Sequence, residues 1–408
     1  MKKINLYYNT SALVLNIPEK VIVDEFAPVI VASPMSYDMF DVLWKKAGGN
    51  NLISSDKILF VVNDGYRNTP TAQILKWINK VEPELLKKAH YLVACGTHES
   101  PTDRHYEFIF GHYYDELKDH ITFHDCHDKI QLKSIGVDHF GEEVFLNRKL
   151  FEYDKIVFIS SVDPHYFAGL TGGRKSLLPG LADFKTVERN HNLANSLDAK
   201  PLQIKGNPVA EHMAEILEMV EKEHFFSIQA IIDADHNLAS IFFGDLDKSF
   251  RQAVEYAKKV YSHNIEEKYD MVICEITPPL DNNLYQAQKA LENSQEAVKD
   301  GGMIIIVSAC TGGIGSRHFW ELADNWDAEN NCTQDGSLQF GSHKLYRVNL
   351  MQKRIDVRLY STLPDEQVSH VFYKPAADIN ELIQSVSDKD GEIKLAIVHN
   401  AGHTVLKI

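Results

Sequence analysis

The sequence predicts an α/β protein with two α/β domains, each built on a mainly parallel, Rossmann-like sheet. The chain has 408 residues, which is more than a single domain of ordinary size contains. Short β-branched runs alternate with longer amphipathic segments, the pattern of strands joined by covering helices. The alternation begins again near Tyr269, so we expect a second sheet in the later part of the chain.

Four apolar runs predict strands of the first domain, and a turn or helix signal follows each of them. They are PVIVAS (28–33), KILFVVN (57–63), HYLVACG (90–96) and KIVFIS (155–160). Residues 249–270 then predict a last helix and a polar connector. We therefore expect the first domain to span residues 1–266.

The second domain is expected to span residues 267–392. It starts with the strand YDMVICEI at 269–276, continues with a helix that runs to Gly301 and Gly302, and then gives the strand MIIIVSAC. A helix over 376–390 precedes the last run, and residues 393–408 are strand-like. This terminal strand either completes the second domain or returns to the first.

Composition excludes several classes of partner. Lys and Arg number 42 against 57 Asp and Glu, a formal charge of −15, and such an acidic surface argues against nonspecific binding to nucleic acid or anionic membranes. No apolar stretch approaches the roughly 18 to 20 residues that span a bilayer. The five Cys are scattered without a CxxC pair, which argues against a disulfide framework or a zinc ribbon. These features predict a cytoplasmic protein without nucleic-acid or membrane partners.

A glycine-rich segment follows the strand at 155–160. Gly169, Gly172 and Gly173 come just before Arg174, Lys175 and Ser176. Glycines at the carboxyl end of a strand let backbone N–H groups approach an anion, which indicates phosphate binding. A nucleotide-dependent kinase or ATPase using GLTGGRKS as a divergent phosphate loop is one interpretation, although Arg174 stands where a P-loop requires Gly. A plain glycine-rich turn with a solvated lysine is the other.

Polar side chains also follow other predicted strands. His98 and His165 come after two strands, so a parallel sheet brings both to its carboxyl edge, where ligands of open α/β sheets bind. Two histidines across a cleft can serve opposite faces of one carbon. Asp64 and Arg67 reach the same edge, and the Arg fork suits a carboxylate or phosphate. A local turn with an exposed Arg67 is the alternative.

In the second domain, Gln286 and Lys289 lie at i and i+3 of a predicted helix and share a face. Such a pair either holds an oxyanion or belongs to a solvated helix face.

Five motifs together resemble the nickel-dependent lactate racemase (LarA) family. They are DGYR (64–67), GTH (96–98), HYFAGLTGGRKSLLPG (165–180), NH (190–191) and LYQAQK (284–289). Their order and spacing match throughout, and the resemblance covers most of the chain. It implies an isomerase that racemises or epimerises C2 of a 2-hydroxy acid, with an active site in the cleft between the two domains.

The resemblance also implies a cofactor in the first domain. Lys175 is similar to the lysine that carries a covalently attached nickel-pincer nucleotide, pyridinium-3,5-bisthiocarboxylic acid mononucleotide with Ni, and His191 to the remaining nickel ligand. Asp64 and Arg67 correspond to further cofactor contacts. Nickel-pincer biosynthesis proteins are then the expected partners, together with a small-molecule 2-hydroxy acid substrate.

By the same resemblance, His98 and His165 correspond to the paired acid/base histidines of a proton-coupled hydride transfer. The implied substrate contacts are Arg67, Gln286, Lys289 and Tyr66. The α-hydrogen of a 2-hydroxy carboxylate is a very poor acid beside a charged carboxylate, so its removal as hydride avoids a dianion. The organometallic group carries that step while the protein orients it.

Three positions depart from the family pattern and bear on specificity. Tyr66 stands where the family motif D-x-T-R-P has Thr. Glu99 replaces the Arg that commonly follows the catalytic histidine, and His343 falls near a position that is often Trp. The expected substrate is either lactate-like or a longer hydroxy or sugar acid, and this more polar set would suit a longer acid such as an aldonate. A noncatalytic nucleotide or nickel carrier is the remaining alternative.

Overall fold

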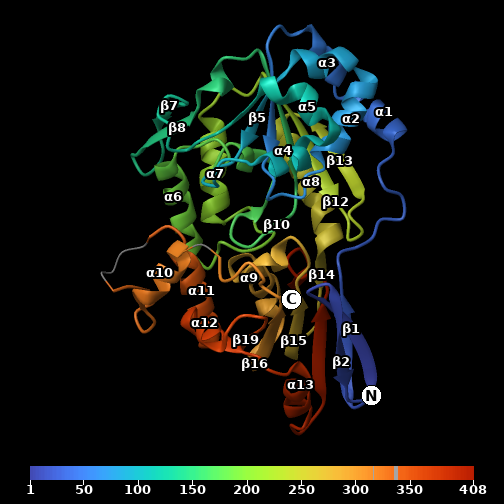
Figure 1. Cartoon of the computed structure of the whole chain (residues 1–408), viewed down its shortest axis with the longest axis vertical. Coiled ribbons are helices and arrows are strands. Elements are labelled where there is room, and N and C mark those ends of the chain that lie inside the picture. Colours follow the sequence, from blue (N-terminus) through green and yellow to red (C-terminus); the bar gives the residue numbers. More distant parts are fainter. Residues whose placement is uncertain (316, 335–338) are drawn as a thin grey trace.

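A computed structural model describes residues 1–315, 317–334 and 339–408, and these form two lobes with one six-stranded sheet in each (Figure 1). The first sheet has the order β13-β12-β9-β4-β5-β6. Its strands are β4 (Ile58–Asn63), β5 (His90–Ala94), β6 (Ile121–Phe123), β9 (Lys155–Ser161), β12 (Phe225–Ile232) and β13 (Leu238–Gly244). All neighbours are parallel except β12 and β13.

Helices cover both faces of the first sheet, which explains why β4, β9 and β12 are almost continuously apolar and buried. One face packs against α1 (Tyr37–Lys46), α2 (Thr71–Val81), α3 (Pro83–Lys88) and α4 (Asp103–Phe110). The other packs against α6 (Phe184–Asn192) and α7 (Pro208–Glu218), and α8 (Leu246–Tyr261) lies along β12. The strands predicted at 57–63, 90–96 and 155–160 are thereby confirmed.

The strand predicted at 28–33 is wrong. The segment is an irregular connection, and Val29 and Ile30 are exposed. Its N–H groups bond to the carbonyl of Val260 and the carboxylate of Asp233 rather than to a neighbouring strand. A β-branched run forms a strand only where a sheet edge is free to pair with it.

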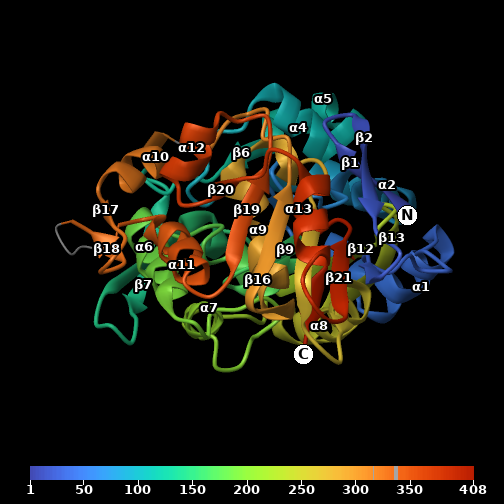
Figure 2. The same ribbon diagram turned by 90° about the horizontal axis from the view of Figure 1, so that it is seen from below.

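The second sheet has the order β20-β19-β16-β15-β21-β3 and is parallel throughout. Its strands are β3 (Val21–Phe26), β15 (Tyr269–Glu275), β16 (Val298–Val307), β19 (Asp356–Tyr360), β20 (Lys374–Pro375) and β21 (Ile393–Val398). One face is covered by α9 (Leu284–Ser294), α10 (Arg317–Asp324), α11 (Ser342–Gln352) and α12 (Asp365–His370). The other carries α13 (Ile379–Ser387) and the hairpin β1 (Lys2–Tyr8) with β2 (Ser11–Ile17) (Figure 2).

Segments near the two ends of the chain pair with each other in the second lobe. β3 pairs with β21 along its whole length, and the β1–β2 hairpin packs on the same sheet (Figure 1). This differs from the expected range of 1–266 for the first domain, because residues 21–26 complete the second sheet. β22 (Val405–Lys407) pairs with β14 (Ser262–Asn264), just after α8, and the boundary near residue 266 stays a prediction.

The helix that was expected to run to Gly302 is shorter. α9 ends at Ser294, and β16 already begins at Val298, which pairs with Tyr269. Gly301 and Gly302 therefore lie within a strand that has a register shift, rather than at a helix terminus. Glycine commonly marks such irregularities in strands. In the described part of the chain, no helix is long and apolar enough to cross a membrane.

Candidate active site

A cavity of about 400 Å³ lies where the carboxyl ends of the two sheets face each other. The loops after β4, β5 and β9 form its wall on the first lobe, and the start of α9, the loop after β16 and α11 form its wall on the second. Every predicted site residue lines it: Asp64, Tyr66, Arg67, His98, His165, Lys175, His191, Gln286 and Lys289. The structure thus brings the predicted set together, and the individual roles stay predictions.

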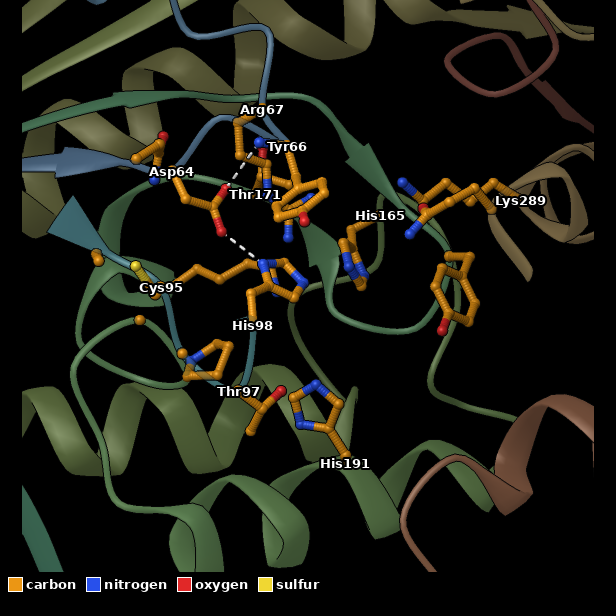
Figure 3. Close-up of a pocket in the computed structure, with 18 of the residues that line it drawn as sticks. Asp64, Tyr66, Arg67, Cys95, Thr97, His98, His165, Thr171, His191 and Lys289 are labelled. Carbon is orange, nitrogen blue, oxygen red and sulfur yellow. Dashed lines mark hydrogen bonds and ion pairs between the residues drawn. The ribbon is translucent and has the colours of Figure 1, made fainter. Parts of the chain in front are cut away.

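Asp64 and His98 form a pair at the cavity wall. Asp64 is buried, and its Oδ2 lies 2.5 Å from Nδ1 of His98 (Figure 3). Burial alone would raise the pKa of the Asp64 carboxyl, but the hydrogen bond and charge of His98 and the charge of Arg67 lower it. An ionised Asp64 accepts the Nδ1–H of His98, which leaves Nε2 as the basic nitrogen. Within the described residues, Nε2 has no hydrogen-bond partner.

His165 is buried at the end of β10 (Pro164–His165), a short strand paired with β11 (Gly169–Leu170). The backbone N–H of Ala168 donates to its Nδ1 at 3.3 Å, so the ring proton belongs on Nε2. Burial, followed by the charges of Lys175, Arg67 and Lys289, lowers the pKa of His165 well below its ordinary value. His165 is therefore a neutral ring whose Nε2–H can donate a hydrogen bond. Its tautomer is opposite to that of His98, which carries its proton on Nδ1.

The glycine-rich segment is a tight turn rather than a phosphate loop. Gly173–Ser176 is a single 3₁₀ turn, whereas a P-loop continues into an α-helix. The N–H groups of Thr171 and Gly173 already donate to Asp163 and Gln229. The geometry therefore argues against the kinase or ATPase interpretation, which needs free backbone N–H groups to bind phosphate.

The glycines of this turn are required by its shape. Gly172 has φ +78°, and a Cβ there would come within 2.6 Å of Val162 and 2.8 Å of the Gln229 amide oxygen. The close packing explains how Lys175 in the next turn is held with only 8% of its surface exposed. Burial, then the charges of Arg67 and Lys289, lowers the pKa of the Lys175 amine well below its ordinary value. Burial thus favours the uncharged, nucleophilic form of the amine, which has no hydrogen-bond partner within the described residues.

His191 lies in the last turn of α6 and lines the same cavity as Lys175, near Thr97 in the view of Figure 3. Its Nδ1–H donates to the carbonyl of Val187 at 2.9 Å, which leaves the lone pair of Nε2 free. Burial, then the charge of Lys175, lowers the pKa of His191 to about 3. Phe167 and Phe340 flank the ring, with centroids 5.1 and 5.4 Å away. A neutral, fixed imidazole with a free nitrogen is the state that binds a metal.

The second lobe contributes Gln286 and Lys289 from the first turns of α9. Asn283 caps this helix by accepting the N–H of Gln286 at 3.0 Å. Burial, followed by the charge of Arg67, lowers the pKa of Lys289 to about 7, and Asp163 opposes this shift. The side chain of Lys289 points toward His165 (Figure 3), so the helix face is part of the site rather than a solvated surface.

Sequence reasoning missed Lys344, which lines the cavity from α11. It is only 1% exposed, and its Nζ donates to the Tyr285 carbonyl at 2.6 Å. No motif marked it. His343 does not line the cavity, because its Nε2 faces the Tyr166 hydroxyl at 3.0 Å behind the wall. Glu99 is exposed and does not line it either, whereas the ring of Tyr66 packs edge-on against His98.

Comparisons with known proteins agree with this architecture. The lactate racemase N-terminal domain matches residues 8–200, and the lactate racemase C-terminal domain matches residues 265–405. The chain belongs to the lactate racemase family. It is an isomerase of the racemase type, and both lobes of the cavity fall within the matched regions.

Two lactate racemases are among the relatives of this family member. The one from Thermoanaerobacterium thermosaccharolyticum is 27% identical over 356 residues, which cover 83% of this chain and 82% of the relative. The one from Lactiplantibacillus plantarum is 26% identical over 347 residues, 79% of this chain and 74% of the relative.

Two solved structures share the fold. The lactate racemase apoprotein from T. thermosaccharolyticum superposes with a TM-score of 0.83 at 22% identity and covers 100% of both chains. A protein from Thermotoga maritima gives a TM-score of 0.73 at 17% identity, covering 93% of this chain and 99% of its own. The fold of two α/β domains with mainly parallel sheets is thereby confirmed.

Proposed function

We propose that this chain inverts C2 of a 2-hydroxy acid with the help of a nickel-pincer nucleotide attached to Lys175 and ligated by His191. The observation that carries the proposal is the convergence of Lys175, His191, His98 and His165 on one cavity. Side chains in separate cavities could not serve one mononucleotide.

The residues fit this cofactor. Covalent attachment through an amide or thioamide needs an unprotonated amine, and burial favours that form of Lys175. Nickel ligation needs a neutral imidazole with a free nitrogen, which the Val187 hydrogen bond leaves at Nε2 of His191. When bound, the group supplies a pyridinium ring that accepts a hydride and returns it.

The substrate carboxylate is expected between the two lobes. Arg67 from the first lobe and Lys289 from the second both line the cavity without a carboxylate partner within ion-pair distance in the described residues. Unpaired cations in a largely buried site favour an anionic ligand, since it removes their mutual repulsion. Gln286 adds an amide that can bond to the carboxylate or to a hydroxyl group.

His98 and His165 provide proton transfer in both directions. His98 can take the substrate hydroxyl proton at Nε2, because Asp64 stabilises the imidazolium that forms. His165 presents an Nε2–H that can donate a hydrogen bond to the substrate oxygen, and it returns a proton only after a second proton has made it an imidazolium. In the resting site His98 is therefore the base and His165 the hydrogen-bond donor.

The substrate is proposed to be lactate-like or a longer hydroxy or sugar acid. The wall contains Lys344, Tyr285 and Tyr66 as well as the carboxylate-binding groups. Such a mixture of cationic, hydroxyl and aromatic groups can bond to further oxygens of a longer acid.

The experiment is to produce the chain together with nickel-pincer biosynthesis proteins and to analyse the product. We expect nickel and a matching mass increment on the Lys175 peptide, and scrambling of C2 in at least one member of a panel of chiral 2-hydroxy acids and sugar acids. Lys175→Ala is the matched control and should carry neither nickel nor the increment. An unmodified Lys175 without nickel would refute the proposal, and a loaded chain that isomerises no member of the panel would favour a carrier.

A further inference from the structure

We propose that His139, His212 and Glu215 form a separate site for a divalent transition-metal ion of the zinc class. Each residue offers a ligand atom, and these atoms lie within 4.8 Å of one another. None of the three lines the interdomain cavity. The site belongs to the outer side of the first lobe, between α7 and the hairpin of β7 (Leu132–Val137) and β8 (Glu143–Asn147).

Helix geometry and hydrogen bonds of the turn place the three donor side chains next to one another. His212 and Glu215 are at i and i+3 of α7 and therefore share a face. His139 lies in the hairpin turn, which Asp138 shapes by accepting the N–H groups of Phe140 and Glu142 at 3.0 and 3.2 Å. The N–H of His139 itself donates to Oε1 of Glu215 at 2.6 Å. The turn is thus fixed to the helix at the point where its ring meets the carboxylate.

Two imidazoles and one carboxylate are a donor set that zinc uses, with a fourth position for water. Nδ1 of His139 lies 2.5 Å from Oε2 of Glu215 in a hydrogen bond, and an ion would take the place of the proton between them. The side chains of His139 and Glu215 are 54% and 30% exposed, while that of His212 is 0% exposed. An ion can therefore enter from solvent and bind against a fixed, buried ring.

An outer layer of hydrogen bonds orients His212. Its Nε2 lies 3.3 Å from Oδ2 of Asp138, and its Nδ1 lies 3.3 Å from Nδ2 of Asn190. Both contacts are long, so a metal–nitrogen bond can replace either. Arg189 holds the same Asp138 oxygen at 2.9 Å. Carboxylate and amide partners of this kind commonly fix metal-binding histidines.

These hydrogen bonds connect the proposed metal site to α6, the helix that carries His191. Arg189 and Asn190 are on α6, immediately before His191. A bound ion would therefore fasten the β7–β8 turn and α7 to the helix that presents His191 to the cavity. We expect the ion to stabilise the fold and to take no part in the reaction.

The test is calorimetric titration of the chelator-treated full chain with Zn²⁺. We expect wild type to bind one equivalent more than His139→Ala, which alters a side chain that is 54% exposed. We expect Glu215→Gln to bind that equivalent at least tenfold more weakly. His112→Ala, which removes another exposed histidine, and His191→Ala, which alters the cavity, should both keep the site. Equal stoichiometry and affinity in wild type, His139→Ala and Glu215→Gln would overturn the proposal, as would the absence of any binding.

Thermal unfolding gives a second readout. Zn²⁺ should raise the melting temperature of wild type and His112→Ala, because an ion that binds only the folded chain stabilises it. The rise should be smaller in His139→Ala. An equal rise in all three chains would place the ion elsewhere and contradict the inference.

Discussion

Substitution of Asp64 by Asn is the most informative perturbation of the cavity, because it keeps the shape of the side chain and removes its charge. Asp64 Oδ1 accepts the N–H of Tyr66 at 3.2 Å, while Oδ2 faces Nδ1 of His98. In Asp64→Asn, the amide oxygen must stay on the Tyr66 side to keep that bond. The amide NH₂ then faces His98, which can accept it only if its proton moves from Nδ1 to Nε2.

The expected magnitude follows from this inversion. A hydrogen bond to a charged group contributes about 1.5 to 3 kcal/mol, so loss of the carboxylate that stabilises the His98 imidazolium should slow turnover about 10- to 100-fold. The wrong tautomer adds to this, since the comparable change in a Ser-His-Asp triad costs about 10⁴-fold. We therefore expect kcat to fall by at least about tenfold.

The assay is stereochemical scrambling by cofactor-loaded enzyme, with nickel content measured so that rates refer to loaded chains. Asp119→Asn is the matched control, because it removes the same charge from an exposed position of the same lobe. Nitrogen NMR of the His98 ring tests the tautomer independently of any substrate. A variant that keeps its rate within twofold, with the proton still on Nδ1 of His98, would refute the reasoning.

Three further predictions follow from the same structure. Because burial lowers the pKa of Lys289 to about 7, kcat/KM for an anionic substrate should decline as pH rises through about 7, where the cation is lost. Lys289→Gln should flatten that alkaline limb of the pH profile. An unchanged limb in Lys289→Gln would contradict the assignment. His191→Ala should retain the mass increment on the modified lysine but lose nickel, as measured by intact-peptide mass and metal analysis, and full nickel content would exclude His191 as a ligand. Arg347 forms a buried ion pair with Glu292 at 2.7 Å and donates to the Ala194 carbonyl of the other lobe at 3.3 Å. Arg347→Met should therefore lower the free energy of unfolding, measured by denaturant titration, by about 3 to 5 kcal/mol. A loss below about 1 kcal/mol would contradict this and show that the remaining Glu292 carboxylate is solvated.

Much of the site could be predicted because parallel strands share a carboxyl edge. Once 57–63, 90–96 and 155–160 are assigned as neighbouring strands, Asp64, His98 and the segment after residue 160 must approach one another. Local periodicity is sufficient for that step, because each strand is buried on both faces and its apolar run is continuous. The motif order then extends the set to the second lobe.

Local patterns did not determine which distant segments would pair. The β-branched run at 28–33 favours a strand but forms an irregular connection. The strand in this part of the chain is instead formed by residues 21–26, which pair with 393–398 at the edge of the second sheet. Most residues of β3 are partly or fully exposed, as expected of a strand at a sheet edge. Its pairing depends on a free sheet edge supplied by residues 393–398, which lie far along the chain from residues 21–26, and no short window of sequence contains that information.

The sequence by itself determined the α/β class, three strands of the first sheet and the nine side chains that meet in the cavity. Tertiary structure alone decided that His98 and His165 hold their protons on opposite nitrogens, that Lys344 joins the wall, and that His139 meets Glu215 and His212. Secondary structure and strand-end placement follow from neighbours along the chain. Proton positions and donor clusters depend on which groups packing brings within about 3 Å, and that is fixed only when the lobes and their helices are assembled.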